Sequence, residues 1–267
     1  MKKVKKSAKV QKNYIMAIFL VLNVLLLFVN FIWGYCNNQS RIIFNKYKEI
    51  SLAEIKQNKN SIPECVKQDY LSEDPKEYSV LNTEKERKLL NKYLKKSDIY
   101  FEYGSGGSTF EALKRGVDKV YSVENSQDWL VNFMYRFDFI KQNEDEGNLE
   151  IVYIDTDETE EWGYPRNKRK DYRVYPEAFA KREKYKEADL VLIDGRYRVA
   201  SLMQVLLNAK NNPIIMIHDS WRNEYKEAYQ FLDEIERADA LTVFSIKKDI
   251  NLEDVKKMYE RYRWDMR

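Results

Sequence analysis

The stretch Asp98-Ile-Tyr-Phe-Glu-Tyr-Gly-Ser-Gly-Gly-Ser-Thr109 decides the fold of this chain, because it combines a strand, a turn and the start of a helix. Its apolar half predicts a short strand that ends near Glu102, and a helical stretch begins at Phe110. The glycines between them allow positive φ angles and close approach of a ligand to the main chain. A helix N-terminus at such a turn favours a carboxylate or phosphate. The three elements together predict a Rossmann-like sheet that holds a nucleoside-bearing cofactor.

Apolar runs and amphipathic stretches alternate on both sides of this turn. Further strands are expected at 119–125, 149–155, 189–194, 213–218 and 241–246, and helices at 127–140, 199–210, 224–237 and 252–263. A capping-box pattern, Thr83-Glu-Lys-Glu86, predicts one more helix before the first strand. This alternation predicts an α/β fold with a mostly parallel sheet and right-handed crossovers.

The composition excludes several classes of protein. The chain has 267 residues, a net charge of +3 and 33% charged residues, with basic and acidic residues interleaved. This pattern is typical of a solvated surface, so no nucleic-acid partner is expected. Cys36 and Cys65 lack the spacing of a metal site, and His218 is the only histidine.

The segment from Tyr14 to Tyr35 is a nearly continuous apolar run whose length suits one membrane-spanning helix. A cleaved signal peptide is the rival interpretation, but the run is long and Gly34-Tyr-Cys-Asn37 is a poor cleavage site. We therefore predict a single-pass membrane protein made of a basic cytosolic tail (1–13), a transmembrane anchor (14–35), a stem (36–78) and a globular domain (79–267).

The distribution of basic residues predicts the orientation of this anchor. Six lysines precede the span within the first 12 residues, whereas Arg41, Lys46 and Lys48 follow it closely. The positive-inside rule then places the N-terminus in the cytosol and the domain on the lumenal or exoplasmic side.

The spacing of Glu102, Gly104, Gly106 and Ser108 is acidic-x-Gly-x-Gly-x-small, with the acidic residue in the strand. This pattern resembles the first motif of class I S-adenosylmethionine (SAM)-dependent methyltransferases. A dinucleotide fingerprint would instead need a third glycine at position 109, where the chain has Thr109. The spacing therefore favours SAM over a dinucleotide as the cofactor.

The resemblance extends from about residue 80 to residue 246. It is carried by the glycine motif, by Val123-Glu124, by Trp162-Gly-Tyr-Pro165, by Leu190-Val-Leu-Ile-Asp-Gly-Arg-Tyr-Arg198 and by Ile217-His-Asp-Ser-Trp-Arg222. These segments look like those of little-characterised class I methyltransferase-like proteins. Such proteins usually end their sheet with a β-hairpin. Here a charged stretch follows 241–246, so the seventh strand is expected to be missing or very short.

The resemblance implies a set of cofactor-binding residues. Glu102 and the turn would hold the methionine part of SAM, Glu124 its ribose, and the region of Asp155 and Asp157 its adenine. The turn residues in this set are Gly104, Ser105, Gly106, Gly107 and Ser108. Independently of the resemblance, an acidic residue about 20 positions beyond a glycine turn suits ribose hydroxyls.

Further polar residues follow the fourth and fifth predicted strands, at the edge of the sheet where ligands gather. Asp194 and His218 are the candidate general bases, and a lone histidine after a buried strand is as often structural. Asp194 and Asp219 also have the layout of carboxylates that hold Mg²⁺ in catechol-type O-methyltransferases. Ser220 stands where a third oxygen ligand is expected, so a divalent metal is a weak prediction.

Aromatic and basic residues suggest how an acceptor would be bound. Trp162 and Tyr164 lie in a long insert, 158–187, and are candidates to contact a sugar ring. Arg196, Arg198 and Arg222 are candidates to bind an acidic acceptor. Packing for the aromatics and ion pairing with nearby acidic residues for the arginines are the plain alternatives.

The leading hypothesis is a SAM-dependent methyltransferase acting on oxygen of a glycan, a glycoconjugate or another small-molecule acceptor. The first alternative is a catalytically silent scaffold with this fold in a membrane glycan-assembly complex, and the second is an enzyme that binds a nucleotide sugar. Because SAM is made in the cytosol, a lumenal domain requires a compartment that imports it. If no such compartment exists, the orientation predicted from the basic residues is wrong. The sequence leaves both orientations of the domain open.

Overall fold

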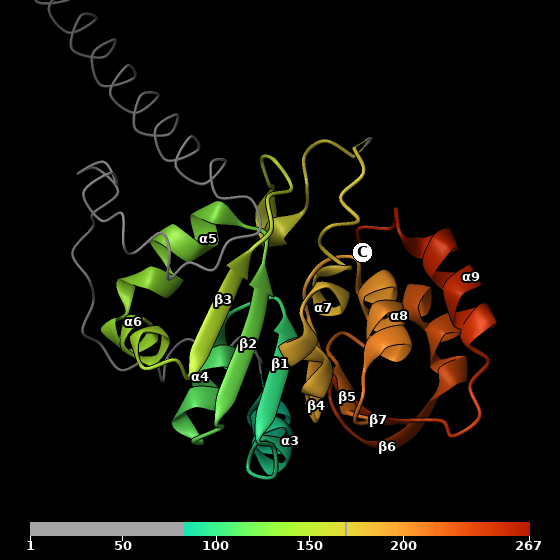
Figure 1. Cartoon of the computed structure of the whole chain (residues 1–267), viewed down its shortest axis with the longest axis horizontal. Coiled ribbons are helices and arrows are strands. Elements are labelled where there is room, and N and C mark those ends of the chain that lie inside the picture. Colours follow the sequence, from blue (N-terminus) through green and yellow to red (C-terminus); the bar gives the residue numbers. More distant parts are fainter. Residues whose placement is uncertain (1–82, 169) are drawn as a thin grey trace, which may run out of the picture. The chain divides into compact units, whose positions relative to one another are not determined.

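A computed structural model describes residues 83–168 and 170–267 (Figure 1). The predicted tail, anchor and stem, 1–78, lie outside this part of the chain. Among the described residues, no helix is both long and apolar enough to span a bilayer.

The described part is built around one seven-stranded sheet in the order β3-β2-β1-β4-β5-β7-β6. The strands are β1 (Ile99–Tyr103), β2 (Lys119–Glu124), β3 (Leu149–Tyr153), β4 (Leu190–Ile193), β5 (Ile214–Ile217), β6 (Leu232–Ala238) and β7 (Leu241–Ile246). The first five are parallel, β7 runs antiparallel to β5, and β6 runs antiparallel to β7. The prediction of a mostly parallel α/β sheet is therefore confirmed.

The helices connect and cover these strands. They are α3 (Glu84–Leu94), α4 (Gly107–Lys114), α5 (Gln127–Asn132), α6 (Asp138–Asp145), α7 (Ala178–Lys181), α8 (Arg198–Asn208) and α9 (Leu252–Tyr262). The capping box predicted at the start of α3 is present, with Thr83 and Glu86 bonding each other's backbone N–H groups. Short 3₁₀ turns are η4 (Met134–Arg136), η5 (Glu161–Gly163), η6 (Glu183–Glu187) and η7 (Asn223–Phe231).

The expected helix at 224–237 is wrong, and so is the expectation that the seventh strand is absent or very short. The segment forms the 3₁₀ turn η7 and then strand β6, which pairs with β7 over its whole length. Most side chains of β6 are exposed or half-buried, so Asp233, Glu234 and Glu236 are tolerated there. Charged residues of this kind protect an edge strand from pairing with another chain. The last two strands thus form the closing hairpin.

A second correction concerns the helix expected at 127–140. The chain instead forms α5, the turn η4 and α6, with the break at Phe133, whose φ and ψ are −128° and −72°. Phe133 and Phe137 both contact Phe110 of α4 through their rings. Aromatic packing onto α4 therefore accompanies the break in this segment.

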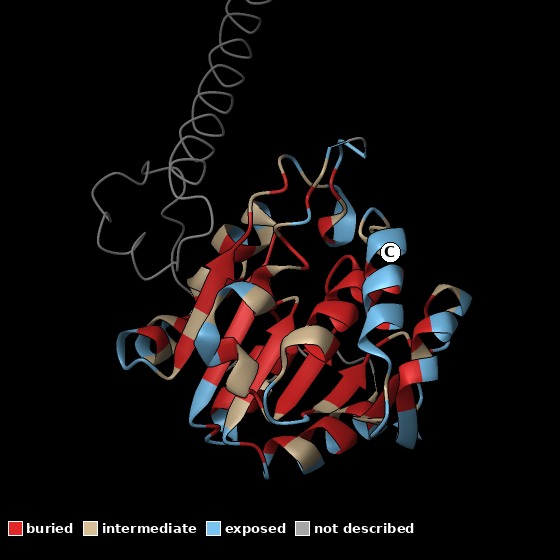
Figure 2. Cartoon of the chain, turned by 45° about the vertical axis from the view of Figure 1, so that its right-hand side comes forward, coloured by how far each residue is buried: buried red, intermediate tan, exposed pale blue. Residues whose placement is uncertain are grey.

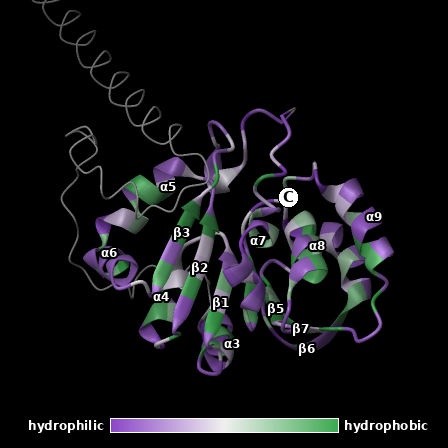
Figure 3. Cartoon of the chain, in the orientation of Figure 1, coloured by the Kyte–Doolittle hydropathy of each residue, from purple (hydrophilic) through white to green (hydrophobic). Residues whose placement is uncertain are grey.

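Alternation along β1 assigns its side chains to two faces of the sheet. Tyr100 and Glu102 face α4, whereas Phe101 and Tyr103 face the opposite side, where the ring of Phe101 meets Phe179 of α7 at 4.9 Å. Strands β1 to β5 and β7 are mostly buried (Figure 2), whereas α9 is largely hydrophilic (Figure 3). Strands covered on both faces read as continuous apolar runs, which is why they were predictable.

Candidate active site

The glycine turn between β1 and α4 has one residue with a positive φ angle. Gly104 has φ +91°, a region that favours glycine. Gly106 is extended, with φ 171°, and Gly107 is the first residue of α4. Positive φ therefore explains only the first of the three glycines of the motif.

Close packing gives a second reason for glycine at 104. A Cβ atom there would lie 3.0 Å from the backbone N and Cα of Gly195, which follows β4. Conversely, a Cβ on Gly195 would lie 2.1 Å from the Tyr175 hydroxyl oxygen. The loops that follow β1 and β4 thus touch through their backbones, and Tyr175 of the insert covers the contact.

Glu102 is fully buried and turned toward α4. Its carboxylate accepts hydrogen bonds from the hydroxyls of Tyr100 (2.9 Å), Ser108 (2.6 Å) and Thr109. Burial raises the pKa of Glu102 to about 7, against the effect of these donors. In this structure Glu102 fastens the first turn of α4 to β1; contact with a cofactor remains a prediction.

Glu124 ends β2 and holds the glycine turn from the other side. Its carboxylate accepts from the backbone N–H of Ser105 at 3.1 Å, from the Ser105 hydroxyl at 3.2 Å, and from the N–H groups of Asn125 and Ser126 at 2.8 Å each. Burial nevertheless raises its pKa. The indole N–H of Trp129 donates to the Ser105 carbonyl at 2.8 Å. The turn is thus fixed before any ligand arrives.

Asp155 and Asp157 follow β3, as predicted. Asp155 accepts from the backbone N–H of Asp157 at 2.8 Å. Asp157 pairs with Lys170 at 2.7 Å and accepts from the Tyr172 hydroxyl at 2.9 Å. Asp157 therefore fastens the insert to the end of β3, and a contact with adenine stays a prediction.

Asp194 and Asp219 do come together, but the guanidinium group of Arg198 pairs with both of them. Arg198 Nη2 is 3.0 Å from Asp194 Oδ1 and 3.3 Å from Asp219 Oδ2, and the side chain is 4% exposed. The described residues contain no group of three or more His, Cys, Asp or Glu side chains suited to a metal ion. Arg198 supplies the positive charge that the predicted metal would have supplied, so the weak metal prediction finds no support.

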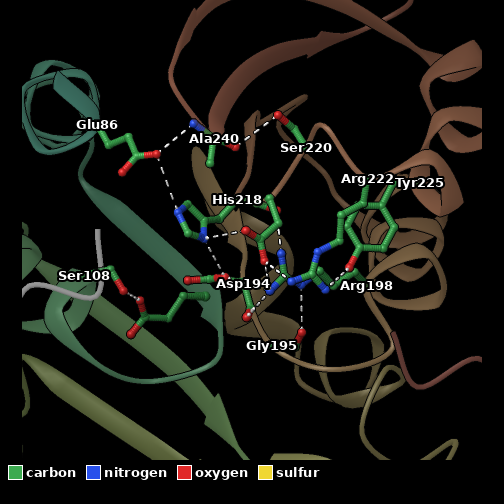
Figure 4. A network of polar contacts seen from close by, with 12 residues as sticks. Glu86, Ser108, Asp194, Gly195, Arg198, His218, Ser220, Arg222, Tyr225 and Ala240 are labelled. Carbon is green, nitrogen blue, oxygen red and sulfur yellow. Dashed lines mark hydrogen bonds and ion pairs between the residues drawn. The ribbon is translucent and has the colours of Figure 1, made fainter. Parts of the chain in front are cut away.

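His218 is buried among acidic residues. Its Nδ1 lies 3.2 Å from Asp194 Oδ1, and its Nε2 is 3.8 Å from Glu86 of α3 and has no hydrogen-bond partner (Figure 4). Burial lowers the pKa of His218, but the hydrogen bond and the charges of Asp194 and Asp219 outweigh this and raise it. In turn, Arg198 and His218 outweigh burial and lower the pKa of Asp194. The two predicted bases are therefore bonded to each other.

The predicted acceptor-binding residues differ in whether they already form ion pairs within the protein. Arg198 is paired as described, and Arg222 pairs with Asp219 at 2.7 Å. Arg196 is 6% exposed, and its guanidinium lies 4.2 Å from the ring centroid of Tyr164. Trp162 is 81% exposed, in a small loop closed by the bridge between Thr159 and Pro165. Arg196 is therefore the arginine of this set without an ion pair among the described residues, and Trp162 is the exposed aromatic residue.

Two residues of this region escaped the sequence reasoning. Tyr175 lies in the insert 158–187 but is fully buried against Tyr103 and Tyr197, so it packs in the core rather than facing a ligand. Glu86 was assigned only to the capping box, yet its second oxygen accepts from the Ala240 N–H at 2.8 Å (Figure 4). The spacing of a capping box carries no signal for such a tertiary bond.

No protein-family model matches the sequence, and no curated protein matches it. A solved methyltransferase-like protein from Silicibacter pomeroyi is similar, with 23% identity, a TM-score of 0.58, and coverage of 70% of this chain and 98% of that one. This chain has the fold of methyltransferase-like proteins. Spermidine synthase from Thermotoga maritima matches at 14% identity and a TM-score of 0.36, covering 62% of this chain and 59% of that chain. MycE methyltransferase, solved with Mg, SAH and mycinamycin VI, matches at 11% identity and a TM-score of 0.37. The match covers 61% of this chain and 48% of that chain.

Proposed function

We propose that this chain is a SAM-dependent methyltransferase. The observation that carries the proposal is the turn at Gly104, which the carboxylate of Glu124 fixes at the ends of β1 and β2. It lies in a sheet with the fold of methyltransferase-like proteins. Ligands of open α/β sheets bind at the carboxyl ends of the strands, beside a switch in strand order. Strand β1, with β2 on one side and β4 on the other, is such a switch point.

The residues at this edge fit such a cofactor. The turn leads into the N-terminus of α4, and the backbones of Gly104 and Gly195 meet without side chains between them. Glu124 would hold the ribose hydroxyls, exchanging the Ser105 hydroxyl for them, and the turn would hold the amino-acid end. When bound, SAM supplies a methyl group on a positively charged sulfur.

The chain's own contribution to methyl transfer is chiefly to position the acceptor. Asp194 is a weak base, because Arg198 and His218 lower its pKa. His218 has one nitrogen bonded to Asp194 and the other facing Glu86. In-line alignment of an acceptor oxygen with the methyl carbon can by itself supply much of the rate. The proton that the acceptor oxygen loses then passes to solvent.

The acceptor that we propose is a hydroxyl group of a glycan or glycoconjugate. Trp162 in the insert and Trp221 after β5 support this, being 81% and 61% exposed in loops that follow the carboxyl ends of β3 and β5. Flat aromatic faces with polar neighbours suit sugar rings. The proposal is checked by transfer of labelled methyl groups from SAM to neutral and acidic oligosaccharides, with Trp162→Ala as the variant expected to raise KM.

We also propose that the segment 14–35 tethers the domain to a membrane, with the N-terminus in the cytosol. The apolar length of the segment and the lysines before it support this proposal. Extraction of cell membranes with alkaline carbonate should leave the full chain in the pellet, and protease should reach residues 79–267 only after the membranes are opened.

A second candidate function is a catalytically silent scaffold, favoured by the mutual pairing of Asp194 and His218. The two candidates are separated by titrating S-adenosylhomocysteine (SAH) into the full-length chain by calorimetry. An enzyme should bind SAH in the micromolar range, and Glu124→Gln should weaken that binding about tenfold. Gln is preferred to Ala because Glu124 also holds the turn.

The control for this titration is Glu260→Gln, which alters an exposed glutamate of α9. A folded wild-type chain that binds no SAH would overturn the enzyme proposal. Affinity for a sugar nucleotide in the same experiment would favour the third reading, an enzyme that binds a nucleotide sugar.

A further inference from the structure

Arg196 is a buried cation without a hydrogen-bonded anion. Its side chain is 6% exposed, and its Nε and Nη1 atoms have no hydrogen-bond partner among the described residues. No carboxylate of the described chain lies within ion-pairing distance of its guanidinium. The two neighbouring arginines differ, because Arg198 and Arg222 each pair with Asp219.

The surroundings hold the Arg196 side chain in place. Its guanidinium lies on the ring of Tyr164, at 4.2 Å from the centroid, and its Cγ lies close to Gly163. Gly163 is itself fixed by the side-chain amide of Asn125, which donates to its carbonyl at 2.8 Å. Arg196 therefore reaches from the end of β4 toward the insert and toward the residue that follows β2.

This path brings Arg196 close to the glycine turn. The residue before it, Gly195, meets Gly104 backbone to backbone. Since β1 lies between β2 and β4 in the sheet, a side chain that starts after β4 and packs on Gly163, which Asn125 holds after β2, lies across the end of β1. The buried N-terminus of α4 follows the same turn, and its helix dipole also favours an anion.

A buried guanidinium with unmade hydrogen bonds is unfavourable unless an anion completes them. The planar fork of arginine suits a carboxylate, which it can bind through two parallel bonds. Glu124 lies at the β2 side of the turn and would repel a carboxylate, whereas it suits uncharged ribose hydroxyls. These charges favour one orientation of a ligand that has both groups. Its ribose would lie near Glu124, and its carboxylate would lie near Arg196 at the β4 side.

We infer that Arg196 anchors the carboxylate at the amino-acid end of SAM, rather than an acidic acceptor. This inference rests on the proposed function and adds to it the residue that selects the amino-acid end of the cofactor. Tyr164 is then a positioning residue, because its ring holds the guanidinium in place.

The test compares two ligands that differ only at that end. SAH carries the carboxylate, and 5′-methylthioadenosine has the same nucleoside and sulfur without the amino-acid part. Both are titrated by calorimetry into the full-length wild-type chain, Arg196→Gln, Arg196→Lys and the control Arg237→Gln. Arg237 is an exposed arginine of β6 paired with Glu234, far from the turn in the sheet order.

We expect Arg196→Gln to weaken SAH binding about tenfold or more and to change methylthioadenosine binding less than about twofold. Arg196→Lys should lie between, because it keeps the charge and loses the fork. Equal losses for the two ligands, or no loss for SAH, would overturn the inference while leaving the proposed function intact. A wild-type chain that binds neither ligand would overturn the proposed function itself. Thermal melting of each variant shows whether it is folded.

Discussion

Gly195 and Tyr175 define the tightest contact of the candidate site. A Cβ on Gly195 would lie 2.1 Å from the Tyr175 hydroxyl oxygen and 3.0 Å from Gly104 N. Overpacking of this kind costs about 1–3 kcal/mol. We therefore expect Gly195→Ala to lower the free energy of unfolding by about that amount in urea denaturation. Removing the hydroxyl with Tyr175→Phe should recover part of the loss.

The double-mutant cycle for this pair tests the assignment of the clash. An equal cost of Gly195→Ala with Tyr or Phe at position 175 would show that the hydroxyl is not the obstacle.

Glu102 predicts a pH dependence of stability. Its pKa is about 7 in the folded chain, against an ordinary value of 4.5. Between these values the folded state holds a proton that the unfolded state has lost, so stability falls as pH rises. Glu102→Gln removes this loss, which we expect to be on the order of 2 kcal/mol between about pH 5 and pH 7.

The measurement is urea denaturation of wild type and Glu102→Gln at both pH values. His218, whose pKa is raised, also contributes stability that is lost as pH rises, but it does so in both proteins. Parallel losses in the two proteins would show that Glu102 is ionised in the folded chain across this range.

Because His218 is the only histidine, its ring protons can be followed by NMR without assignment. We expect a pKa above the ordinary value of 6.5, since the Asp194 bond and the carboxylate charges outweigh burial. Asp194→Asn should lower this pKa more than Asp219→Asn does, because Asp219 Oδ1 is 3.9 Å from Nδ1, against 3.2 Å for Asp194. The reverse order would contradict the pairing of Asp194 with His218.

At this scale the sequence predicted where polar residues lie but not what they contact. The motif located the turn, and the strand ends located Glu124, Asp194 and His218 at one edge of the sheet. Whether an arginine meets a carboxylate depends on side-chain direction across the sheet. Arg196 and Arg198 are two residues apart, yet only Arg198 reaches Asp194 and Asp219 as an ion pair.

At the scale of elements, Glu86 joins α3 to the turn between β6 and β7. One carboxylate oxygen completes the capping box and the other accepts from Ala240 N. Glu86→Ala keeps the Thr83 cap but removes the acceptor of the Thr83 and Ala240 N–H groups, so we expect a loss of about 2 kcal/mol or more in the free energy of unfolding. Glu84→Ala on the same helix is the control and should change little, because its partner Lys88 is exposed.

Equal effects of the two glutamate variants in urea denaturation would mean that the bond to the hairpin contributes nothing.

The elements that were predicted correctly are those whose pattern is set by burial on both faces. Strands β1 to β5 are apolar runs and were placed within about two residues. The prediction was wrong for strand β6 because only Leu232 is buried in it. Its charged side chains therefore repeat like those of a surface helix. Pairing with β7, which a local pattern cannot show, decides its conformation.

At the scale of the whole molecule, the strand order depends on how consecutive strands are connected. The spacing of the strands in the sequence limits these connections but does not determine them. Right-handed crossovers allow a parallel sheet of five strands, but the closing hairpin had to be seen in the structure. The division of the chain at residue 79 is still a prediction from composition. The first helix of the described residues, α3, begins after Thr83 with its capping box.

That division has a direct test. Every contact of the turn, of Glu124 and of Arg198 described above is made within residues 83–267, so we expect the fragment 79–267 to fold and to bind SAH as the full chain does. At 100 times its Kd, a ligand adds about 2.7 kcal/mol to the free energy of unfolding. For a domain of this size that corresponds to a rise in Tm of roughly 5–10 °C.

Thermal melting of the fragment and of the full chain, each with and without SAH, measures this rise. Equal rises would place the whole cofactor site in the domain. A rise in the full chain alone would mean that residues before 79 complete the site. In that case the stem has a binding role as well as a tethering one.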